Sequence, residues 1–231
     1  MKMEKTASAF SLRYWFRAPV RRVLARQLYF TGIESLMLVL LIGIAVGAII
    51  VSQLHYTFGQ SGANTLRLLA TLLITELAPL LTALILIARS SSAMASELAA
   101  MRVNNEIWML TQFGINPRHY LMLPRITGML LASFILAVYL AAAAMLTAAL
   151  MTSGPNALNE LRLLGDSLGV GNMVQGLCKT ALFGVVIAAI ACRAGFRAGH
   201  AMTDIPRAAS SAVVSSLLAV FVIDALWAVL K

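Results

Sequence analysis

Five long apolar stretches, separated by shorter polar ones, organise this chain. Each holds at least about 20 residues with few charges, the length that an α-helix needs to cross a hydrocarbon core of roughly 30 Å. The stretches predict transmembrane helices over residues 33–54, 66–88, 126–151, 173–194 and 208–230. We therefore expect an all-α membrane protein in which one transmembrane domain occupies residues 1–231.

Composition supports this fold class. Of the 231 residues, 60% are hydrophobic and only 12% are charged, against roughly 25% charged residues in a typical soluble domain. The net charge of +9 does not indicate nucleic-acid binding, because the basic residues cluster beside the apolar stretches. That arrangement is typical of membrane topology.

The distribution of lysine and arginine predicts the orientation. Seven precede the first span, four lie in residues 89–125 and three in residues 193–207, whereas the other side has only Arg67, Arg162 and Lys231. Basic residues accumulate on the cytoplasmic side of a membrane. We therefore expect a bacterial inner-membrane protein with a cytoplasmic N-terminus and a periplasmic C-terminus.

Two polar segments predict further helices outside the hydrocarbon. Residues 10–30 interleave aromatic side chains with arginines, which favours an interfacial helix within residues 1–30 over a disordered basic tail. Residues 89–118 form a cytoplasmic segment between the second and third spans, with an amphipathic helix over Ser90–Phe113. This helix either rests on the membrane surface or docks a partner, and its mixed charges favour docking.

Three acidic residues fall inside predicted spans, where a carboxylate is costly and usually faces protein or water. Glu34 lies near a span end. Glu76 precedes Pro79, whose missing N–H frees backbone carbonyls and bends the helix. Glu76 either lines a polar cavity or forms a hydrogen bond with a neighbouring helix. For Asp224, in the outer half of the last span, a structural role is favoured. Gln53 and Lys179 are weaker candidates for that cavity, and Lys179 is expected to pair with an intramembrane acid.

Small residues and missing motifs complete this description. Gly43 and Gly47 form a GxxxG pattern that favours close helix packing over a chance occurrence. The three histidines lack metal-ligand spacing, which gives no metal site. The sequence has neither a G-x-S-x-G motif nor a phosphate-binding G-x-x-x-x-G-K-[ST] loop. We expect a non-enzymatic chain without a cofactor of its own, so any ATP and Mg²⁺ would belong to a partner.

The central polar segment and its flanks resemble the MlaE (YrbE-type) permeases of lipid ABC transporters that work with MCE-domain proteins. The similar residues extend over nearly the whole chain: Arg26–Gly32, Glu76–Pro79, Ala88–Ala93, Ser96–Leu98, Met101–Val103, Glu106, Gly114–Arg118, Tyr120–Leu121, Pro124–Arg125, Arg207–Ala208, Ala212–Val214 and Asp224.

Several positions depart from the family pattern. Ala88, Ser91 and Ala99 replace family glycines, and Asn116 replaces an aspartate. Thr75 stands where the family often has arginine. The last change predicts that Glu76 has no cationic neighbour and that headgroup recognition differs.

The resemblance implies a homodimer of five-span subunits, each with an N-terminal interfacial helix. It also implies a cytoplasmic ABC ATPase docked after the second span and a periplasmic hexamer of MCE-domain proteins, and it leaves open a small STAS-type subunit. By position, Glu97, Arg102 and Glu106 would couple to the ATPase. The candidates for a phospholipid cavity are Ile50, Gln53, Glu76 and Asp224.

Two functions follow as hypotheses. The leading one is the permease subunit of an ATP-driven phospholipid transporter, which moves lipid between the inner membrane and a periplasmic MCE protein and so maintains outer-membrane lipid asymmetry. The rival is an ATP-independent membrane scaffold or channel that anchors a partner complex.

Overall fold

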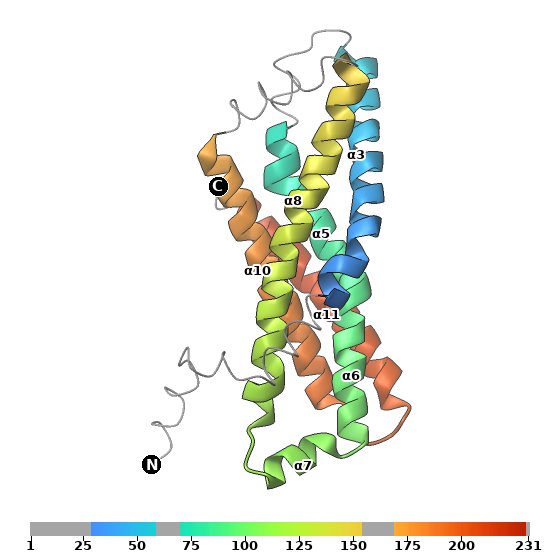
Figure 1. Cartoon of the computed structure of the whole chain (residues 1–231), viewed down its shortest axis with the longest axis vertical. Coiled ribbons are helices and arrows are strands. Elements are labelled where there is room, and N and C mark those ends of the chain that lie inside the picture. Colours follow the sequence, from blue (N-terminus) through green and yellow to red (C-terminus); the bar gives the residue numbers. More distant parts are fainter. Residues whose placement is uncertain (1–28, 59–69, 154–168, 230–231) are drawn as a thin grey trace. The chain divides into compact units, whose positions relative to one another are not determined.

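The computed structural model describes residues 29–58, 70–153 and 169–229, and the regular elements within these ranges are all helical (Figure 1). Five of the helical segments are long and apolar enough to cross a membrane. They are Glu34–Gln53, Ala70–Val103, Tyr120–Thr152, Val170–Arg197 and Asp204–Val229. The predicted interfacial helix lies outside the described residues, except for its last two positions.

Several spans combine α-helical and π-helical stretches. Their order along the chain is η2 (Tyr29–Ile33), α3 (Glu34–Phe58), η3 (Leu73–Leu77), α5 (Ala78–Leu86), η4 (Ile87–Ser91), α6 (Ser92–Val103), α7 (Glu106–Gln112), η5 (Arg118–Met122), α8 (Leu123–Ser153), α10 (Val170–Arg197) and α11 (Asp204–Val229), where η marks a π-helical stretch.

The chain divides into two compact units. The first unit comprises residues 1–31, 86–132 and 184–231, and the second comprises residues 32–85 and 133–183. Because α8 and α10 each contribute to both units, we describe the packing of each unit by itself.

In the second unit, α3 packs closely along α8 (Figure 1). A β-carbon placed on Gly43 would lie 2.9 Å from the β-carbon of Ala143. One placed on Gly47 would collide with the backbone of Ala144. Only glycine permits this approach, because a β-carbon at either position would lie too close to α8. The close approach stabilises the pair of helices, since helices in lipid gain association energy from van der Waals contact.

In the first unit, α6 packs against α11 and also lies close to α10. Small side chains make this possible, since Ala99, Ala198 and Ala208 form one buried cluster. A β-carbon on Gly195 of α10 would lie 2.9 Å from the Ala95 carbonyl oxygen of α6. Leu98 packs into a second cluster, which includes Leu121 and Cys192.

The structure differs from the predicted boundary of the second span. The sequence predicts a span ending at Ala88 and a separate amphipathic helix over Ser90–Phe113, but the apolar helical segment continues to Val103. A new short helix, α7, then begins at Glu106. The break falls at Asn105, whose φ of 58° is left-handed, a conformation that asparagine tolerates better than most residues.

The longer helix follows from the burial of residues that look polar in the sequence. Ser90 and Ser91 are buried, and the Ser91 hydroxyl lies 3.4 Å from that of Ser216 in α11. Met94, Ala95, Leu98 and Ala99 are also buried. This part of the chain is therefore a packed element of the first unit rather than a helix lying on a surface.

Candidate functional site

The intramembrane carboxylate of Glu76 lies in a π-helical stretch next to Pro79. Proline has no N–H and its ring crowds the carbonyl four residues earlier, here that of Thr75. The helix widens instead, with the Ala78 N–H donating to the Leu73 carbonyl five residues back. The Thr75 hydroxyl donates to the Thr71 carbonyl at 2.9 Å. Such π-helical turns often occur at functional sites.

Glu76 forms an ion pair with Lys179 of α10 within the second unit. The Lys179 side chain is fully buried, whereas that of Glu76 is 32% exposed. The lysine ammonium also lies 6.0 Å from the centre of the Phe183 ring, within range of a cation–π interaction. The expected pairing of Lys179 with an intramembrane acid is thus confirmed.

This pair corrects the expectation that Glu76 lacks a cationic neighbour. The resemblance implied this, because Thr75 stands where the family often has arginine. The positive charge instead comes from another helix, 103 positions away in sequence. Glu76 therefore bonds a neighbouring helix, as its structural alternative predicts, while a third of its side chain stays open to its surroundings.

An apolar pocket of about 280 Å³ lies in the second unit, lined by sequence neighbours of Glu76 and Lys179 but not by these two residues themselves. Its walls come from η3, α5, α8 and α10, and include Ile74, Pro79, Ala141, Met145, Gly176 and Thr180. The Thr180 hydroxyl donates to the Gly176 carbonyl at 2.8 Å, which satisfies its polar group within the helix. The volume is near the lower end of ligand pockets, roughly 300–1,000 Å³, and fits part of an acyl chain rather than a whole phospholipid.

Glycine shapes this pocket as well. Gly176 lies so close to Ile74 that a β-carbon there would collide with the Ile74 carbonyl. Gly176 is one helical turn before Lys179, so its close approach brings the lysine near η3. This residue was absent from the predicted site, although a glycine one turn before an intramembrane lysine is a signal that the sequence contains.

The other predicted cavity residues are divided between the two units. Ile50 is half-buried and Gln53 is exposed, both on α3 of the second unit. Neither lines the apolar pocket. Asp224 is half-buried on α11 and belongs to the first unit. The structure thus pairs Glu76 with Lys179, and an apolar pocket lies among their sequence neighbours. A role for Ile50, Gln53 and Asp224 in a lipid cavity stays a prediction.

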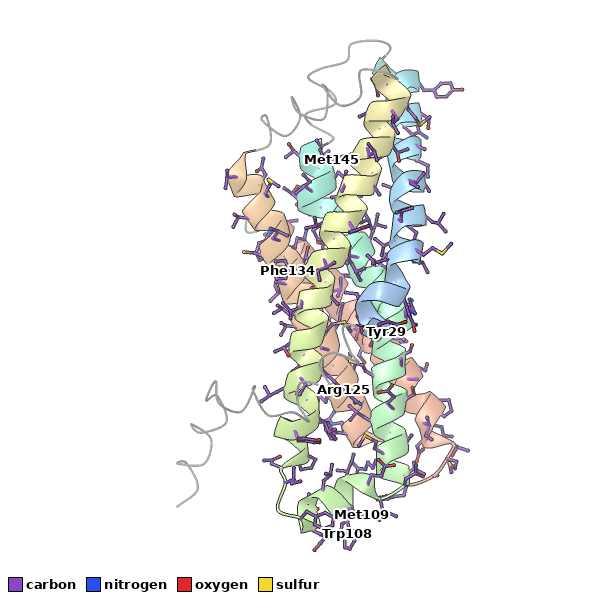
Figure 2. The ribbon with its side chains drawn as sticks, viewed as in Figure 1. Tyr29, Trp108, Met109, Arg125, Phe134 and Met145 are labelled. Atoms are coloured by element: carbon purple, nitrogen blue, oxygen red, sulfur yellow. The ribbon has the colours of Figure 1, made fainter. Side chains whose placement is uncertain are left out.

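The predicted coupling residues Glu97 and Arg102 make contacts within the first unit. Glu97 pairs with Arg125 of α8 at 3.0 Å; the glutamate side chain is 57% exposed and that of the arginine 7%. In Figure 2, Arg125 projects from α8 toward α6. Arg102 donates to the backbone carbonyl of Phe196 on α10. Sequence reasoning did not single out Arg125, because nothing in the chain identifies which acid it would meet.

The short helix α7 presents the most exposed part of the predicted coupling segment. It connects α6 to the part of the chain that enters α8 (Figure 1). Glu106 lies at its first turn, and Trp108, Met109 and Phe113 are all exposed large apolar residues. Figure 2 shows Trp108 and Met109 at this end of the first unit. Neighbouring exposed apolar side chains of this size are typical of an interaction surface.

These features together define a class of protein. Among the described residues, five apolar helices, a partly buried ion pair and an apolar pocket are typical of a multi-pass membrane transport protein. The sequence model of the family described as "Permease MlaE" matches residues 24–230. The chain therefore belongs to the MlaE permease family.

Curated relatives agree with this assignment. The chain is 30% identical over 209 residues to a probable ABC transporter permease protein of Synechocystis, covering 87% of this chain and 79% of the relative. It is 27% identical over 205 residues to a probable ABC transporter permease protein of Rickettsia typhi, with the same coverage. The chloroplastic protein TRIGALACTOSYLDIACYLGLYCEROL 1 of Arabidopsis is 29% identical over 205 residues, which cover 86% of this chain and 58% of the relative.

Family membership fits a transport subunit rather than an ATPase. It supports the assignment of this chain as the permease subunit of a lipid transporter.

Proposed function

We propose that this chain is the permease subunit of an ATP-driven phospholipid transporter that moves lipid between the inner membrane and a periplasmic MCE protein. The observation that carries the proposal is an apolar pocket lined by the same helical segments that hold the Glu76–Lys179 pair, in a chain of the MlaE permease family. A phospholipid needs apolar walls for its acyl chains and a few placed polar groups for its head.

The two parts of this site would have different roles. The pocket would hold a segment of acyl chain against Ile74, Pro79 and Met145. Lys179 neutralises the charge of Glu76, which makes its carboxylate tolerable in hydrocarbon. The exposed part of that carboxylate would contact polar headgroup atoms. The lysine is fully buried, so we assign it to positioning Glu76 rather than to contacting lipid.

Energy for transport would come from a separate chain. An ABC permease works with an ATPase, and the sequence of this chain lacks a phosphate-binding loop. We propose that a cytoplasmic ABC ATPase, with its own ATP and Mg²⁺, docks on α7 through Glu106 and the exposed Trp108 and Met109. Glu97 and Arg102 would then support this surface through their contacts with α8 and α10.

The remaining partners are part of the same proposal. Two copies of the chain would form a homodimer in the inner membrane, with the N-terminus cytoplasmic and the C-terminus periplasmic. In favour of a further apolar neighbour, α11 exposes Leu218, Val222 and Leu226, which are spaced by four residues along one face. Lipid or a second copy would cover that face. An MCE-domain hexamer would receive or supply the phospholipid on the periplasmic side.

Purification of the chain from its native membrane in mild detergent tests the proposal, with mass spectrometry of every protein and lipid that accompanies it. The proposal predicts an ABC ATPase, an MCE-domain protein and phospholipid enriched over its proportion in the membrane. A chain that purifies alone, with lipids in bulk proportions, would contradict it and favour the scaffold or channel.

A further inference from the structure

A second pocket, of about 470 Å³, lies in the first unit between the end of α10 and the start of α11. Its polar lining consists of three arginines, two serines and one aspartate: Arg193, Arg197, Arg207, Ser211, Ser215 and Asp204. It is lined by none of the residues of the apolar pocket in the second unit. Its chemistry also differs, because charged side chains and hydroxyls share its lining with small apolar residues, whereas the other pocket is almost wholly apolar.

The spacing of these residues explains why they gather in one place. Arg193 and Arg197 are four positions apart on α10, and Arg207, Ser211 and Ser215 follow one another at the same interval on α11. Residues four apart lie on the same helix face. Two helix faces, one with two arginines and one with an arginine and two hydroxyls, therefore line the pocket together.

The pocket has an excess of positive charge. Asp204 is its only acidic lining residue, and its carboxylate lies 3.5 Å from Arg207. Asp204 also accepts a hydrogen bond from the Ala201 backbone N–H at 3.3 Å. Arg193 and Arg197 form no ion pair with another described residue, so within this part of the chain three arginines face one aspartate.

The position of the pocket matches the depth of lipid headgroups. It opens where α10 ends at Arg197 and α11 begins at Asp204, and ends of spans with basic residues lie at the membrane interface. Ile190 and Ala194 add an apolar wall one to two turns further into α10. A pocket with basic residues at its opening and an apolar inner wall matches the region of a phospholipid where the phosphate headgroup meets the acyl chains.

We infer that this pocket binds a phosphate group, and that an anionic phospholipid headgroup is the source that its position favours. Guanidinium groups bind phosphate oxygens through paired, charge-assisted hydrogen bonds, and the serine hydroxyls can donate further ones. Basic pockets between transmembrane helices on the cytoplasmic side are suited to anionic headgroups. The inference does not depend on the proposed transport function, because it concerns a different set of residues and a binding equilibrium.

Lipid binding to the purified full-length protein tests the inference. The protein, in a neutral detergent, is titrated with phosphatidylglycerol and separately with phosphatidylcholine, and bound lipid is counted by native mass spectrometry. We expect a saturable phosphatidylglycerol site whose affinity falls about tenfold or more in R193Q/R197Q, because two charge-assisted contacts are lost. R193K/R197K keeps the charge but not the planar fork, so we expect an intermediate loss.

Matched serine variants and a free-phosphate arm complete the test. Ser211→Ala should weaken binding, whereas Ser210→Ala should not, since both serines are exposed but only Ser211 lines the pocket. Equal binding of the two lipids, together with competition by inorganic phosphate that is lost in R193Q/R197Q, would support a phosphate site whose ligand is a soluble phosphate. Unchanged phosphatidylglycerol binding in a folded R193Q/R197Q protein would overturn the inference and reduce these arginines to topology signals.

Discussion

The ion pair between Glu76 and Lys179 gives the sharpest prediction. Three variants isolate it: E76Q, K179M and E76Q/K179M, which change charge with little change in side-chain volume. Each single variant leaves one group of a partly or fully buried pair without its partner. Removing one partner of a buried ion pair costs about 3–5 kcal/mol, whereas replacing both groups is often close to neutral.

The expected magnitudes follow from the burial of each group. K179M leaves a carboxylate that is one-third exposed and can reach other polar groups, so we expect a loss in unfolding free energy of about 2–3 kcal/mol. E76Q leaves a fully buried ammonium, so we expect the larger loss, of about 3–5 kcal/mol. The double variant should cost less than either single one.

Reversible unfolding in mixed micelles, followed by circular dichroism, measures these differences. A hydrogen bond between membrane helices is worth only about 0.6 kcal/mol on average, so the size of the coupling energy distinguishes an ion pair from a simple hydrogen bond. Losses that add in the double variant would refute the reasoning. Lipid transport supplies a second readout. If the double variant recovers stability but transports little lipid, Glu76 has a role in lipid handling. If it recovers both, the role of Glu76 is structural.

Three further predictions concern other parts of the molecule. Ala141→Phe should fill the apolar pocket and lower lipid transport several-fold without blocking assembly, whereas Leu146→Phe on the exposed face of α8 should not; retained transport in a folded Ala141→Phe protein would contradict the lipid site. Gly47→Ala should lower the unfolding free energy by about 1–3 kcal/mol through overpacking. Gly171→Ala should not, because a β-carbon there meets open space. If the Gly47→Ala protein unfolds like the unsubstituted protein, the tight contact is refuted. Trp108→Ala should reduce co-purification of the ATPase without changing thermal stability, and full retention of the ATPase would remove this side chain from the docking surface.

The structure also changes how a charge reversal at Glu97 should be read. E97K would place a lysine beside Arg125, which is 7% exposed, so a lost ATPase could reflect local repulsion rather than a lost contact. The exchange E97R/R125E restores an opposite-charge pair and separates these explanations. Because Glu97 supports the docking surface through its pair with Arg125, we expect the exchanged protein to regain both stability and ATPase binding. A stable exchanged protein that does not bind the ATPase would contradict this indirect role and assign Glu97 a direct contact with the partner.

The five spans could be predicted from the sequence because each depends on a local property, an apolar run long enough to cross hydrocarbon. The end of the second span could not. Ser91 and Glu97 resemble the start of a polar helix in the sequence, yet each meets a partner from another helix, Ser216 for Ser91 and Arg125 for Glu97. A local pattern contains no information about such distant partners, so the predicted boundary came 15 residues too early.

The candidate site shows the same limit. The sequence indicates that Glu76 and Lys179 are costly inside a membrane and should be paired, but the identity of the partner depends on how α10 packs on η3. The arginines near the end of α10 likewise read as topology signals until the fold places them opposite Arg207 and two serines. Residue types were informative, and their grouping required the packed helices.

ATP-dependent lipid transfer tests the central claim most directly. The complex purified through this chain is placed in liposomes containing a labelled phospholipid, and transfer of the label to MCE-bearing acceptor is followed with ATP, without ATP and with a non-hydrolysable analogue. Our account predicts transfer that requires ATP hydrolysis and this chain, and that falls when Ala141→Phe fills the pocket. Transfer at the same rate without ATP, or none in a complete complex, would contradict the assignment of this chain as the permease of an ATP-driven lipid transporter.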